Sequence, residues 1–523
     1  MTAVTSGTLS GNTTWTKANS PYFLTGDITV PDSVILTIDP GVVVRFKAVT
    51  DDLSSGEDVN RIEIRVSGKL KAHGTATDSI FFTSNAQTPS SGDWYGFVSF
   101  KGTNNWDKVG AIDIKYARVS HYIKGIYYSN YVNSGWSSSM SPDSIKVHNS
   151  VFYAGGDAVS SNEYWGFRPI EFCNNIVYNG GVYDYGKSAY KKFENNLFKN
   201  ATTNTTEMYT RGDQRGQHRM NISIKNNVFE KGEMRVEAET SPSSNASEQR
   251  SATITVSGNT LHRHSQSKIT ISYNNGSTSN KIPMDSTSVT VESNTIIGKN
   301  SDGEGLFLGN NSQPANWIAR NNTIRSTDWG IRAESSTSGK YLIENNTIDS
   351  TENTGIRVYR GNANIIGNTV QYCGKYYWSN YQYNGIYLNS DFNYPSIDTL
   401  KNNTIRYNGN VNYPNGVSST ITTGVGGVTI YGYTQAVLNN NNIYENQGHD
   451  LINLVPNSTA TIQDAKYNYW GDSTTAEMNL GGNPKNILMI HDEYDDNTKG
   501  FVNYGQNFQG IITKNILPDS LFY

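Results

Sequence analysis

The tetrapeptide NNTI stands at 321–324, 345–348 and 402–405, and variants such as NNLF and GNTL recur along most of the chain. Aligning the last Asn before each apolar pair gives one column with spacings from 21 to 38 residues. The column comprises Asn149, Asn175, Asn196, Asn227, Asn259, Asn294, Asn322, Asn346, Asn368, Asn403, Asn441 and Asn468. Self-similarity at such intervals is typical of a solenoid, in which each repeat packs on its neighbours.

Each repeat contains a second phrase, Gly-apolar-x-apolar-x, as in GIRAE (330–334), GIRVY (355–359) and GVTIY (427–431). A third alternating segment, such as KYLIEN (340–345), lies between the two phrases. All three segments have a two-residue period and lack the i, i+3, i+4 pattern of helices, which predicts three short strands per repeat. We therefore expect an all-β solenoid, a parallel β-helix of about 12 or more coils.

The Asn column has a physical reason in this architecture. A tight corner between two strands needs a residue that tolerates a left-handed φ, and stacked Asn side chains can bond to the corners above and below. The many Asn-x-Thr triplets are also compatible with glycosylation acceptors. Their fixed phase relative to the apolar residues favours the corner interpretation.

Composition excludes several functional classes. With 42 basic and 46 acidic residues, the net charge is −4, which provides no field to gather nucleic acid. The chain has no apolar run long enough for membrane insertion, and its first residues, MTAVTSGTLS, lack the pattern of a signal peptide. We expect a soluble monomer, in a mature form from which a leader was cut.

The chain resembles the secreted right-handed parallel β-helix proteins of bacteria, which have the pectin-lyase-like fold. The stretches 13–47 and 66–84 look like their opening coil, and NYWGD (468–472) with 490–504 looks like their closing cap. This resemblance implies export from a bacterial cell, to the medium or the cell surface. It leaves the activity open, because the fold hosts lyases, hydrolases, epimerases, adhesins and phage spikes.

Stacked coils need caps, because an uncapped end exposes strand edges and apolar surface. We therefore interpret 1–110 as an N-terminal cap with the first coils, 111–464 as regular coils with long loops, and 465–523 as a C-terminal cap, all within one continuous domain. The long excursions, such as 128–144, 239–251 and 374–384, would form Tyr- and Trp-rich walls around a trough near 317–368.

Placing the apolar residues of the Gly-phrase strand inward leaves two columns of rings and guanidinium groups facing outward. Rings stack on sugar faces, and Arg binds carboxylate or sulfate in bidentate fashion, so a glycan could run along this face. The alternative is that Arg235 with Glu237, and Arg332 with Glu334, are simple surface ion pairs. The candidate substrate-binding residues are Tyr183, Tyr209, Arg211, Phe307, Arg332, Glu334, Arg357, Tyr359 and Tyr387.

Hydrolysis is the first candidate reaction. Glu237 and Glu239 stand at i and i+2 on one strand, with α-carbons about 6.6–7 Å apart, compatible with the roughly 6.5–9.5 Å carboxyl separation of inverting glycosidases. They would act as acid and base, and Arg235 would orient the substrate. The order Arg-x-Glu-x-acid at 235–239 is similar to that of ι-carrageenases, which carry Asp where this chain has Glu239.

Elimination at a uronate is the second candidate reaction, because it needs a base and a cation that stabilises an enolate-like charge. The candidates are Arg235, Arg332, Arg357, Tyr359, Lys187, Lys225 and His218. No cofactor is required, although β-helix lyases often hold Ca²⁺ with several carboxylates. The acidic stretches 51–58 and 492–496 are interpreted as solvated turns, and His262 with His264 is too small a set for zinc.

Cys173 and Cys373 lie several repeats apart, so we expect two buried free thiols rather than a disulfide. Taken together, the sequence predicts a secreted protein that cleaves an anionic polysaccharide by hydrolysis or elimination. The alternative is a non-catalytic adhesin or surface scaffold that uses the same rings and Arg side chains only to bind a glycan.

Overall fold

The computed structural model describes most of the chain in two compact units. Met1–Thr260 belongs to the first unit, and Leu261–Ser277 with Pro283–Tyr523 belongs to the second. The described residues are 1–100, 110–128, 144–161, 169–186, 190–199, 206–214, 220–240, 252–264, 268–275, 287–299, 304–310, 316–374, 383–409, 425–459, 461–505 and 510.

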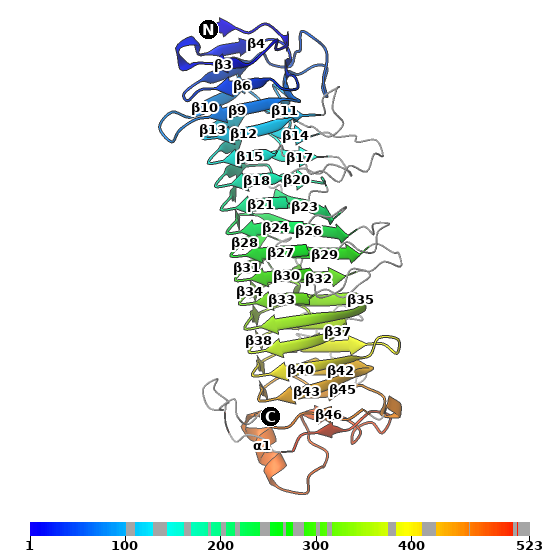
Figure 1. Cartoon of the computed structure of the whole chain (residues 1–523). Helices are drawn as coiled ribbons and strands as arrows, with labels where there is room; N and C mark the ends of the chain where they lie inside the picture. The colour runs from blue at the N-terminus through cyan, green and yellow to red at the C-terminus, as the bar shows by residue number, and fades with distance from the viewer. Residues whose placement is uncertain are drawn as a thin grey trace. The chain divides into compact units, whose positions relative to one another are not determined.

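In the first unit, three ladders of parallel strands repeat along the chain (Figure 1). The corner ladder contains β1 (Thr2–Ala3), β4 (Tyr22–Leu24), β7 (Val43–Phe46), β10 (Ile80–Ser84), β13 (Ala117–Ser120), β16 (Val151–Tyr153), β19 (Ile176–Tyr178), β22 (Leu197–Lys199) and β25 (Val228–Phe229). The Gly-phrase ladder contains β2 (Gly7–Thr8), β5 (Ile28–Val30), β8 (Glu63–Val66), β11 (Gly96–Ser99), β14 (Ile126–Tyr128), β17 (Val159–Ser161), β20 (Val182–Asp184), β23 (Thr206–Gln214) and β26 (Gly232–Thr240).

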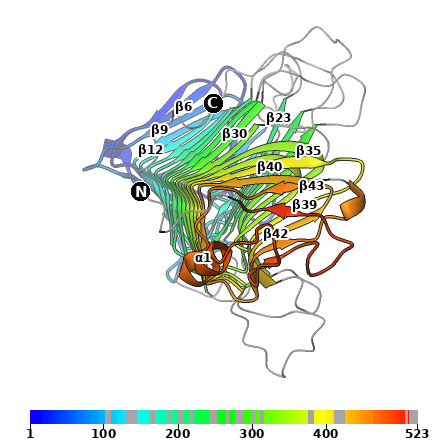
Figure 2. The same ribbon diagram turned by 90° about the horizontal axis from the view of Figure 1, so that it is seen from below.

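The third ladder of this unit contains β3 (Thr13–Trp15), β6 (Ile35–Ile38), β9 (Lys69–His73), β12 (Ala111–Lys115), β15 (Ile145–His148), β18 (Ile170–Cys173), β21 (Tyr190–Glu194), β24 (Met220–Lys225) and β27 (Ala252–Ser257). Seen from below, β6, β9 and β12 overlap one another (Figure 2). Strand β28 (Thr260–His264) contains the boundary between the units.

The second unit repeats the same three ladders. Its corner ladder contains β31 (Thr295–Gly298), β34 (Thr323–Arg325), β36 (Thr347–Asp349), β38 (Thr369–Gln371), β41 (Thr404–Arg406) and β44 (Asn442–Tyr444). Its Gly-phrase ladder contains β29 (Ile269–Asn275), β32 (Glu304–Asn310), β39 (Tyr383–Ser390), β42 (Val425–Gly432), β45 (His449–Asn453) and β47 (Ile490–His491). Its third ladder contains β30 (Thr287–Glu292), β33 (Asn316–Arg320), β40 (Ser396–Lys401), β43 (Thr434–Asn439), β46 (Gln463–Asp464) and β48 (Val502–Asn503).

Two longer strands belong to both the Gly-phrase and the third ladder of the second unit. They are β35 (Trp329–Glu344) and β37 (Ile356–Ile366), and their register shifts between Glu334 and Gly339. In these coils the predicted second and third strands are continuous. The parallel ladders confirm the predicted fold class, a right-handed parallel β-helix.

Apolar columns fill the interior of the coils. Ile112 is paired with Ile145, which in turn is paired with Ile170, and all three side chains are fully buried. The rings of Phe198 and Phe229 stack with centroids 4.6 Å apart. Because burying one such side chain contributes roughly 1.5–3 kcal/mol, these columns supply the main stabilisation of the stack.

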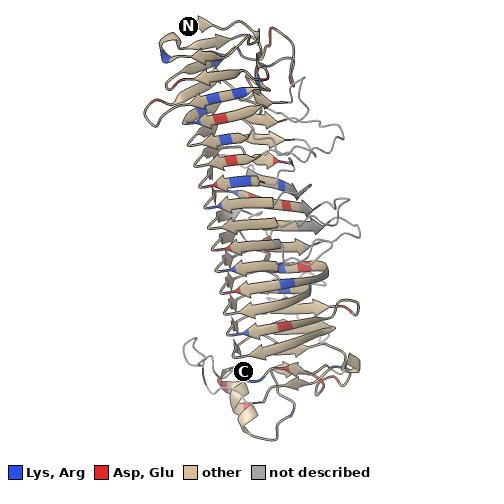
Figure 3. Cartoon of the chain, in the orientation of Figure 1, with Lys and Arg blue, Asp and Glu red and all other residues tan. Residues whose placement is uncertain are grey.

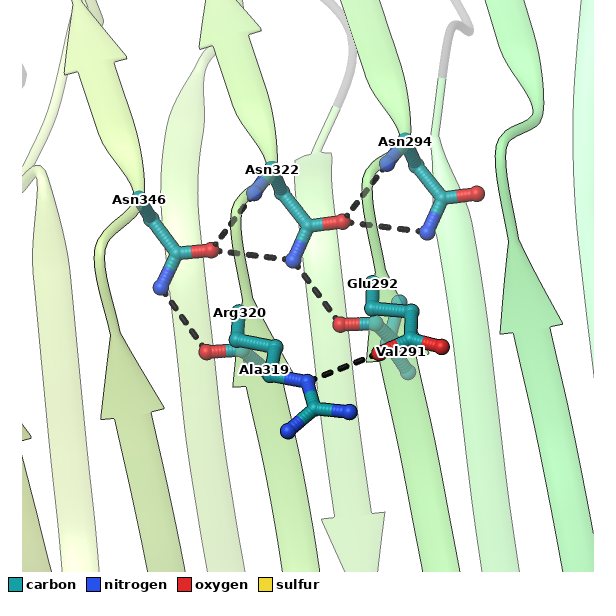
Figure 4. A network of polar contacts seen from close by, with 7 residues as sticks. All are labelled: Val291, Glu292, Asn294, Ala319, Arg320, Asn322 and Asn346. Atoms are coloured by element: carbon teal, nitrogen blue, oxygen red, sulfur yellow. Dashed lines mark hydrogen bonds and ion pairs between the residues drawn. The ribbon is translucent and has the colours of Figure 1, made fainter.

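The Asn column forms a ladder of buried side chains in each unit. In the second unit, Oδ1 of Asn322 accepts hydrogen bonds from N and Nδ2 of Asn294, each at 3.0 Å, and Asn346 bonds to Asn322 in the same way at 2.9 Å (Figure 4). Nδ2 of Asn322 also donates to the Val291 carbonyl at 2.9 Å. Each amide therefore satisfies buried polar groups in two neighbouring coils, as predicted for stacked corners.

The prediction that these same Asn residues take the left-handed φ is wrong. That conformation belongs to the residue just before each ladder member, such as Asn321 (φ 56°) before Asn322 and Gly258 (φ 66°) before Asn259. The corner thus divides its two requirements between adjacent residues: the first takes the left-handed φ, and the second supplies the buried side chain of the ladder.

Asn149 was assigned to the wrong position by one residue. It has a φ of 53°, and Ser150 takes its place in the ladder. The backbone N of Ser150 donates to Oδ1 of Asn175 at 2.9 Å, while its Oγ accepts from the backbone N of Ala117 at 3.1 Å. The same Oγ donates to the His148 carbonyl at 2.9 Å, so this hydroxyl both accepts and donates, with one proton where the amide of Asn has two.

Near the C-terminal end of the second unit, the helix α1 (Gly471–Asn479) buries Thr474, Thr475 and Met478. The short 3₁₀ turns η1 (Lys17–Asn19) and η3 (Asn457–Thr459) are the other helical segments in the part of the chain that the structure describes. None of these helices has the length and apolar character that a membrane crossing requires. The boundaries predicted for the caps stay predictions.

The two acidic stretches are mostly exposed, as expected for solvated turns, but each begins with a buried carboxylate. Asp51 and Asp492 are buried, with 6% and 2% of their surface exposed. Asp51 accepts bonds from the backbone N of Asp27 at 3.0 Å and of Ser55 at 2.8 Å, and Asp492 accepts from that of Val502 at 3.1 Å. These carboxylates therefore organise loop backbone. The prediction of free thiols is confirmed, since Cys173 and Cys373 are both buried and unbridged.

Candidate functional site

The first part of the predicted outward face lies on the Gly-phrase ladder of the first unit. Tyr183, Tyr209 and Arg235 stand in register on β20, β23 and β26. The rings of Tyr183 and Tyr209 stack with centroids 5.1 Å apart, and the ring of Tyr185 lies 5.9 Å from that of Tyr209. We call Tyr183, Tyr185, Tyr209, Arg211, Arg235 and Glu237 the first cluster.

Both Arg side chains of the first cluster lie over tyrosine rings. The guanidinium carbon of Arg211 is 5.2 Å from the Tyr185 ring centroid, and that of Arg235 is 5.4 Å from the Tyr209 centroid. Arg211 also donates from Nη1 to the hydroxyl of Tyr185 at 3.0 Å. Such cation–π contacts attract the guanidinium groups to the faces of the rings.

Glu237 is bound by its neighbours on both carboxylate oxygens. Arg235 Nη2 donates to Oε1 at 2.5 Å, and the Tyr209 hydroxyl donates to Oε2 at 2.7 Å. Burial, together with the bond to Glu237, raises the pKa of the Tyr209 phenol above its usual range. The ion pair that was the alternative interpretation of Arg235 and Glu237 is therefore present.

Glu239 lies on β26, in register with Asp213 of β23. Its side chain lies outside the described residues, and so does the predicted carboxyl separation from Glu237. Lys187 and His218, two candidates for elimination, also fall outside them. Lys225 ends β24, a strand of the third ladder, so its strand belongs to a different ladder from that of Arg235.

The second part of the face lies on the Gly-phrase ladder of the second unit. Phe307, Arg332, Arg357 and Tyr387 stand in register on β32, β35, β37 and β39. We call Glu304, Phe307, Trp329, Arg332, Glu334 and Arg357 the second cluster. Acidic and basic residues are interspersed on the strands of each unit (Figure 3).

Arg332 is the most connected residue of the second cluster. It bonds to Glu334 from Nε at 3.1 Å and from Nη2 at 3.0 Å, and its Nη1 contacts Glu304. Its guanidinium carbon lies 5.3 Å from the Phe307 centroid and 5.1 Å from the Trp329 centroid. The predicted Arg332–Glu334 ion pair is thus one part of a larger network.

Arg357 completes this network. Its Nε lies 3.4 Å from Glu334 Oε1, and its guanidinium carbon lies 5.5 Å from the Trp329 ring centroid. Trp329 therefore stacks against the guanidinium groups of two adjacent coils. With two carboxylates and two guanidinium groups, the second cluster has balanced formal charge.

Two predicted binding residues present little surface to a ligand. Tyr209 is 4% exposed and Tyr387 is 1% exposed. The ring of Tyr387 stacks on that of Tyr431 at 6.5 Å, and Tyr431 is 46% exposed. In the first cluster, Tyr183 is the more accessible ring, at 37%. The buried rings support the exposed rings beside them.

Sequence reasoning missed several members of this face. Trp329 and Glu304 precede their Gly phrases, and Arg360 follows one, so the two columns did not include them. Arg360 pairs with Asp391 at 2.5 Å and lies 4.7 Å from the Tyr359 ring and 5.6 Å from the Tyr394 ring. A count of rings within three residues of each Gly phrase would have found Trp329.

The turn after β39 adds exposed rings to the second unit. Phe392 is 74% exposed, and its ring meets that of Tyr433 edge-on, with centroids 5.5 Å apart. Tyr433, at 41%, and Tyr394, at 36%, are also accessible. Among the described residues, no group of three or more His, Cys, Asp or Glu side chains is arranged to hold a metal ion.

Comparison with known proteins gives one match. Residues 7–125 match the family model described as a pectate-lyase-like beta helix domain. No curated protein and no solved structure matches the chain. The matched residues cover the opening coils of the first unit, and the described residues of both units have the same parallel ladders. Residues 7–125 therefore resemble a pectate-lyase-like β-helix domain, and the parallel ladders show the parallel β-helix fold in the described residues of both units.

Proposed function

We propose that the protein binds a polysaccharide along the outward face of the Gly-phrase ladder in each unit. The observation that carries this proposal is the in-register series of rings and guanidinium groups, Tyr183–Tyr209–Arg235 in one unit and Phe307–Arg332–Arg357 in the other. Neighbouring members are one strand spacing apart, about 4.8 Å, which is close to the length of a sugar unit. The pectate-lyase-like match supports a polysaccharide-active or polysaccharide-binding protein at the family level.

The ion pairs favour binding over catalysis as the primary role. Arg235 and Tyr209 occupy the oxygens of Glu237, and Arg332 contacts both Glu304 and Glu334. A carboxylate held by such donors is well placed to fix an Arg plane, while a general acid or base needs free access to substrate. The two Arg of the first cluster outnumber its one Glu, which favours an anionic sugar there.

The test is a binding panel of alginate, pectate, glycosaminoglycans, carrageenans and neutral glucans, measured by affinity electrophoresis and calorimetry. We expect binding to at least one anionic polymer, with a smaller effect for neutral glucans. Failure to bind any polymer would contradict the proposal. Secretion or display on a bacterial cell surface, action as a monomer and independence of a metal cofactor form part of the same proposal.

Cleavage is the second candidate function, favoured by the alternation of Glu237 and Glu239 on β26 beside Arg235. In this version Glu237 and Glu239 act as acid and base, in the order similar to that of ι-carrageenases. Glu237→Gln should abolish release of reducing ends while leaving affinity nearly intact, and unchanged release would reject these roles. An unsaturated uronate product, seen by its ultraviolet absorbance, would indicate elimination instead.

A further inference from the structure

A lysine and an aspartate are buried together inside the first unit. Lys191 on β21 stands in register with Ile170 and Ile222 of the adjacent coils, so it occupies an apolar column of the interior. Asp184 on β20 stands in register with Ser161 and Thr210. The side chains of Lys191 and Asp184 both have 0% exposure.

The two groups are in direct contact. Lys191 Nζ contacts Asp184 Oδ2 and also donates to the Gly186 carbonyl at 2.5 Å. The Tyr128 hydroxyl contacts the other carboxyl oxygen, Oδ1, and Thr210 Oγ1 donates to Oδ2 at 2.7 Å. Tyr128 is itself 1% exposed. The amine, the carboxyl group and two hydroxyl donors therefore share a site closed to solvent.

Burial on this scale works against the charged forms. It raises the pKa of the Asp184 carboxyl and lowers that of the Lys191 amine, against the opposing effect of their mutual attraction. A buried ion pair is also often no more stable than apolar residues of the same volume, because desolvation offsets the attraction. Proton transfer from Nζ to the carboxylate gives a neutral amine beside a neutral acid, which are the forms that condense.

We propose that Lys191 and Asp184 join covalently through an isopeptide bond between Nζ and Cγ. After the proton transfer, the lone pair of Nζ attacks Cγ, and negative charge develops on Oδ1, where the Tyr128 O–H can stabilise it. The Oδ2 hydroxyl then takes a proton from the attacking nitrogen and leaves as water. One C–N bond forms, one C–O bond breaks and one water is released, so no oxidant or other reactant is needed.

The bond would close a short ring of chain beneath the first cluster. Asp184 lies between Tyr183 and Tyr185, whose rings are nearly parallel with centroids 6.5 Å apart. The Lys191 end of the ring lies on the third ladder. A covalent link would therefore fix the strand that carries these two rings to the neighbouring strand of the same coil.

The intact mass of the purified, denatured wild-type chain tests the proposal directly. We expect a mass lower than that of the sequence by one water molecule. After digestion with trypsin, the peptide ending at Lys187 should remain joined to the one containing Lys191. A full sequence mass in protein that unfolds cooperatively would overturn the proposal, as would a water loss mapped to any other residue.

Two variants separate the chemistry from folding. Lys191→Met keeps an unbranched side chain of similar length in the apolar column and should show the full mass expected from its sequence. Tyr128→Phe keeps the ring but removes the hydroxyl. When intact mass is followed over time, this variant should lose water more slowly or less completely than wild type. Equal rates in Tyr128→Phe and wild type would overturn the role assigned to Tyr128.

Discussion

Tyr209 and Glu237 lie on adjacent coils, and the Tyr209 hydroxyl donates to Glu237 Oε2 at 2.7 Å. The same carboxylate pairs with Arg235, whose guanidinium lies over the Tyr209 ring. Ring, acid and base therefore hold one another in place. Substituting any one of these three side chains should therefore displace the other two, even when no ligand is bound.

Tyr209→Phe tests this mutual support. Loss of the hydroxyl removes a hydrogen bond to a charged group, so we expect the free energy of unfolding to fall by about 1 kcal/mol. Tyr183→Phe is the matched control, because the Tyr183 hydroxyl has no hydrogen bond to the described residues and its ring is more exposed. Denaturant unfolding of the two variants gives the comparison, and equal stability would contradict it.

Tyr183→Ala should weaken binding of the polysaccharide identified in the panel. Truncating an exposed ring at the centre of a contact commonly costs more than about 1 kcal/mol, so affinity should fall by about fivefold or more. Calorimetric titration provides the measurement, with thermal unfolding to show that the fold is retained. Unchanged affinity would remove Tyr183 from the proposed face.

The double change Arg332→Ala with Arg357→Ala should weaken binding of charged glycans more than that of neutral ones, because it leaves Glu304 and Glu334 without their guanidinium partners. Arg320→Ala is the control, since Arg320 also pairs with a glutamate, Glu292 at 2.7 Å, but lies on the third ladder. Affinity electrophoresis in gels with each polymer measures the effect. Equal losses for charged and neutral polymers would contradict a role in anion recognition.

Asn322→Ala should destabilise the protein far more than Asn321→Gly. The alanine removes the oxygen that accepts from N and Nδ2 of Asn294, and it removes the amide that donates to Asn346 Oδ1 and to the Val291 carbonyl, which should cost about 2 kcal/mol or more. Glycine at 321 keeps the left-handed φ without strain, so its effect should stay within about 0.5 kcal/mol. Chemical unfolding measures the free energy of unfolding of both variants. A larger loss for Asn321→Gly than for Asn322→Ala would contradict the separate roles assigned to the two corner residues.

Asp398 should make stability depend on pH. Burial raises its pKa from 3.8 to about 7, although Ala363 N and Ser396 Oγ donate to the carboxyl group. Between these two values the folded state holds a proton that the unfolded state has lost. Stability should therefore rise as pH falls from about 7 towards 4, by on the order of 2–4 kcal/mol in full.

Asp398→Asn isolates this contribution, because an amide does not titrate. Its melting temperature should rise less than that of wild type between pH 8 and pH 5. Asp450, whose pKa burial also raises to about 7, should behave in the same way when changed to Asn. Identical pH profiles for wild type and both variants would show that these carboxyl groups titrate normally in the fold.

The fold could be predicted because the residues required at each corner recur as short sequence motifs. A buried amide that bonds to its equivalent in the next coil must recur once per coil, whatever the loop length, so NNTI and its variants reveal the period. The residue with the left-handed φ was misplaced by one, because Asn often occupies both positions, as at 321 and 322. Gly258, Ser293, Gly367 and Tyr467, where the first position is not Asn, distinguish the two roles.

The candidate site was predictable only in part. Alternation along a strand identifies which residues face outward, and so it found Arg332 with Glu334. Alternation does not show how far the side chains of neighbouring residues extend. Trp329 and Glu304, which contact Arg332 from outside the Gly phrases, were therefore missed. The buried Lys191 shares its parity with Phe193, which points inward, but sequence alone does not reveal that Asp184 meets it across the coil.

The Asn ladder also makes the coils interchangeable. Each step from one coil to the next uses the same amide-to-amide bonds, regardless of whether the intervening chain is 22 residues long, as between Asn346 and Asn368, or 38, as between Asn403 and Asn441. If a whole repeat is duplicated or deleted in the gene, the two coils that become neighbours can form the same amide-to-amide bonds. Such a protein can lengthen, shorten or shuffle its recognition surface by recombination without inventing a new corner.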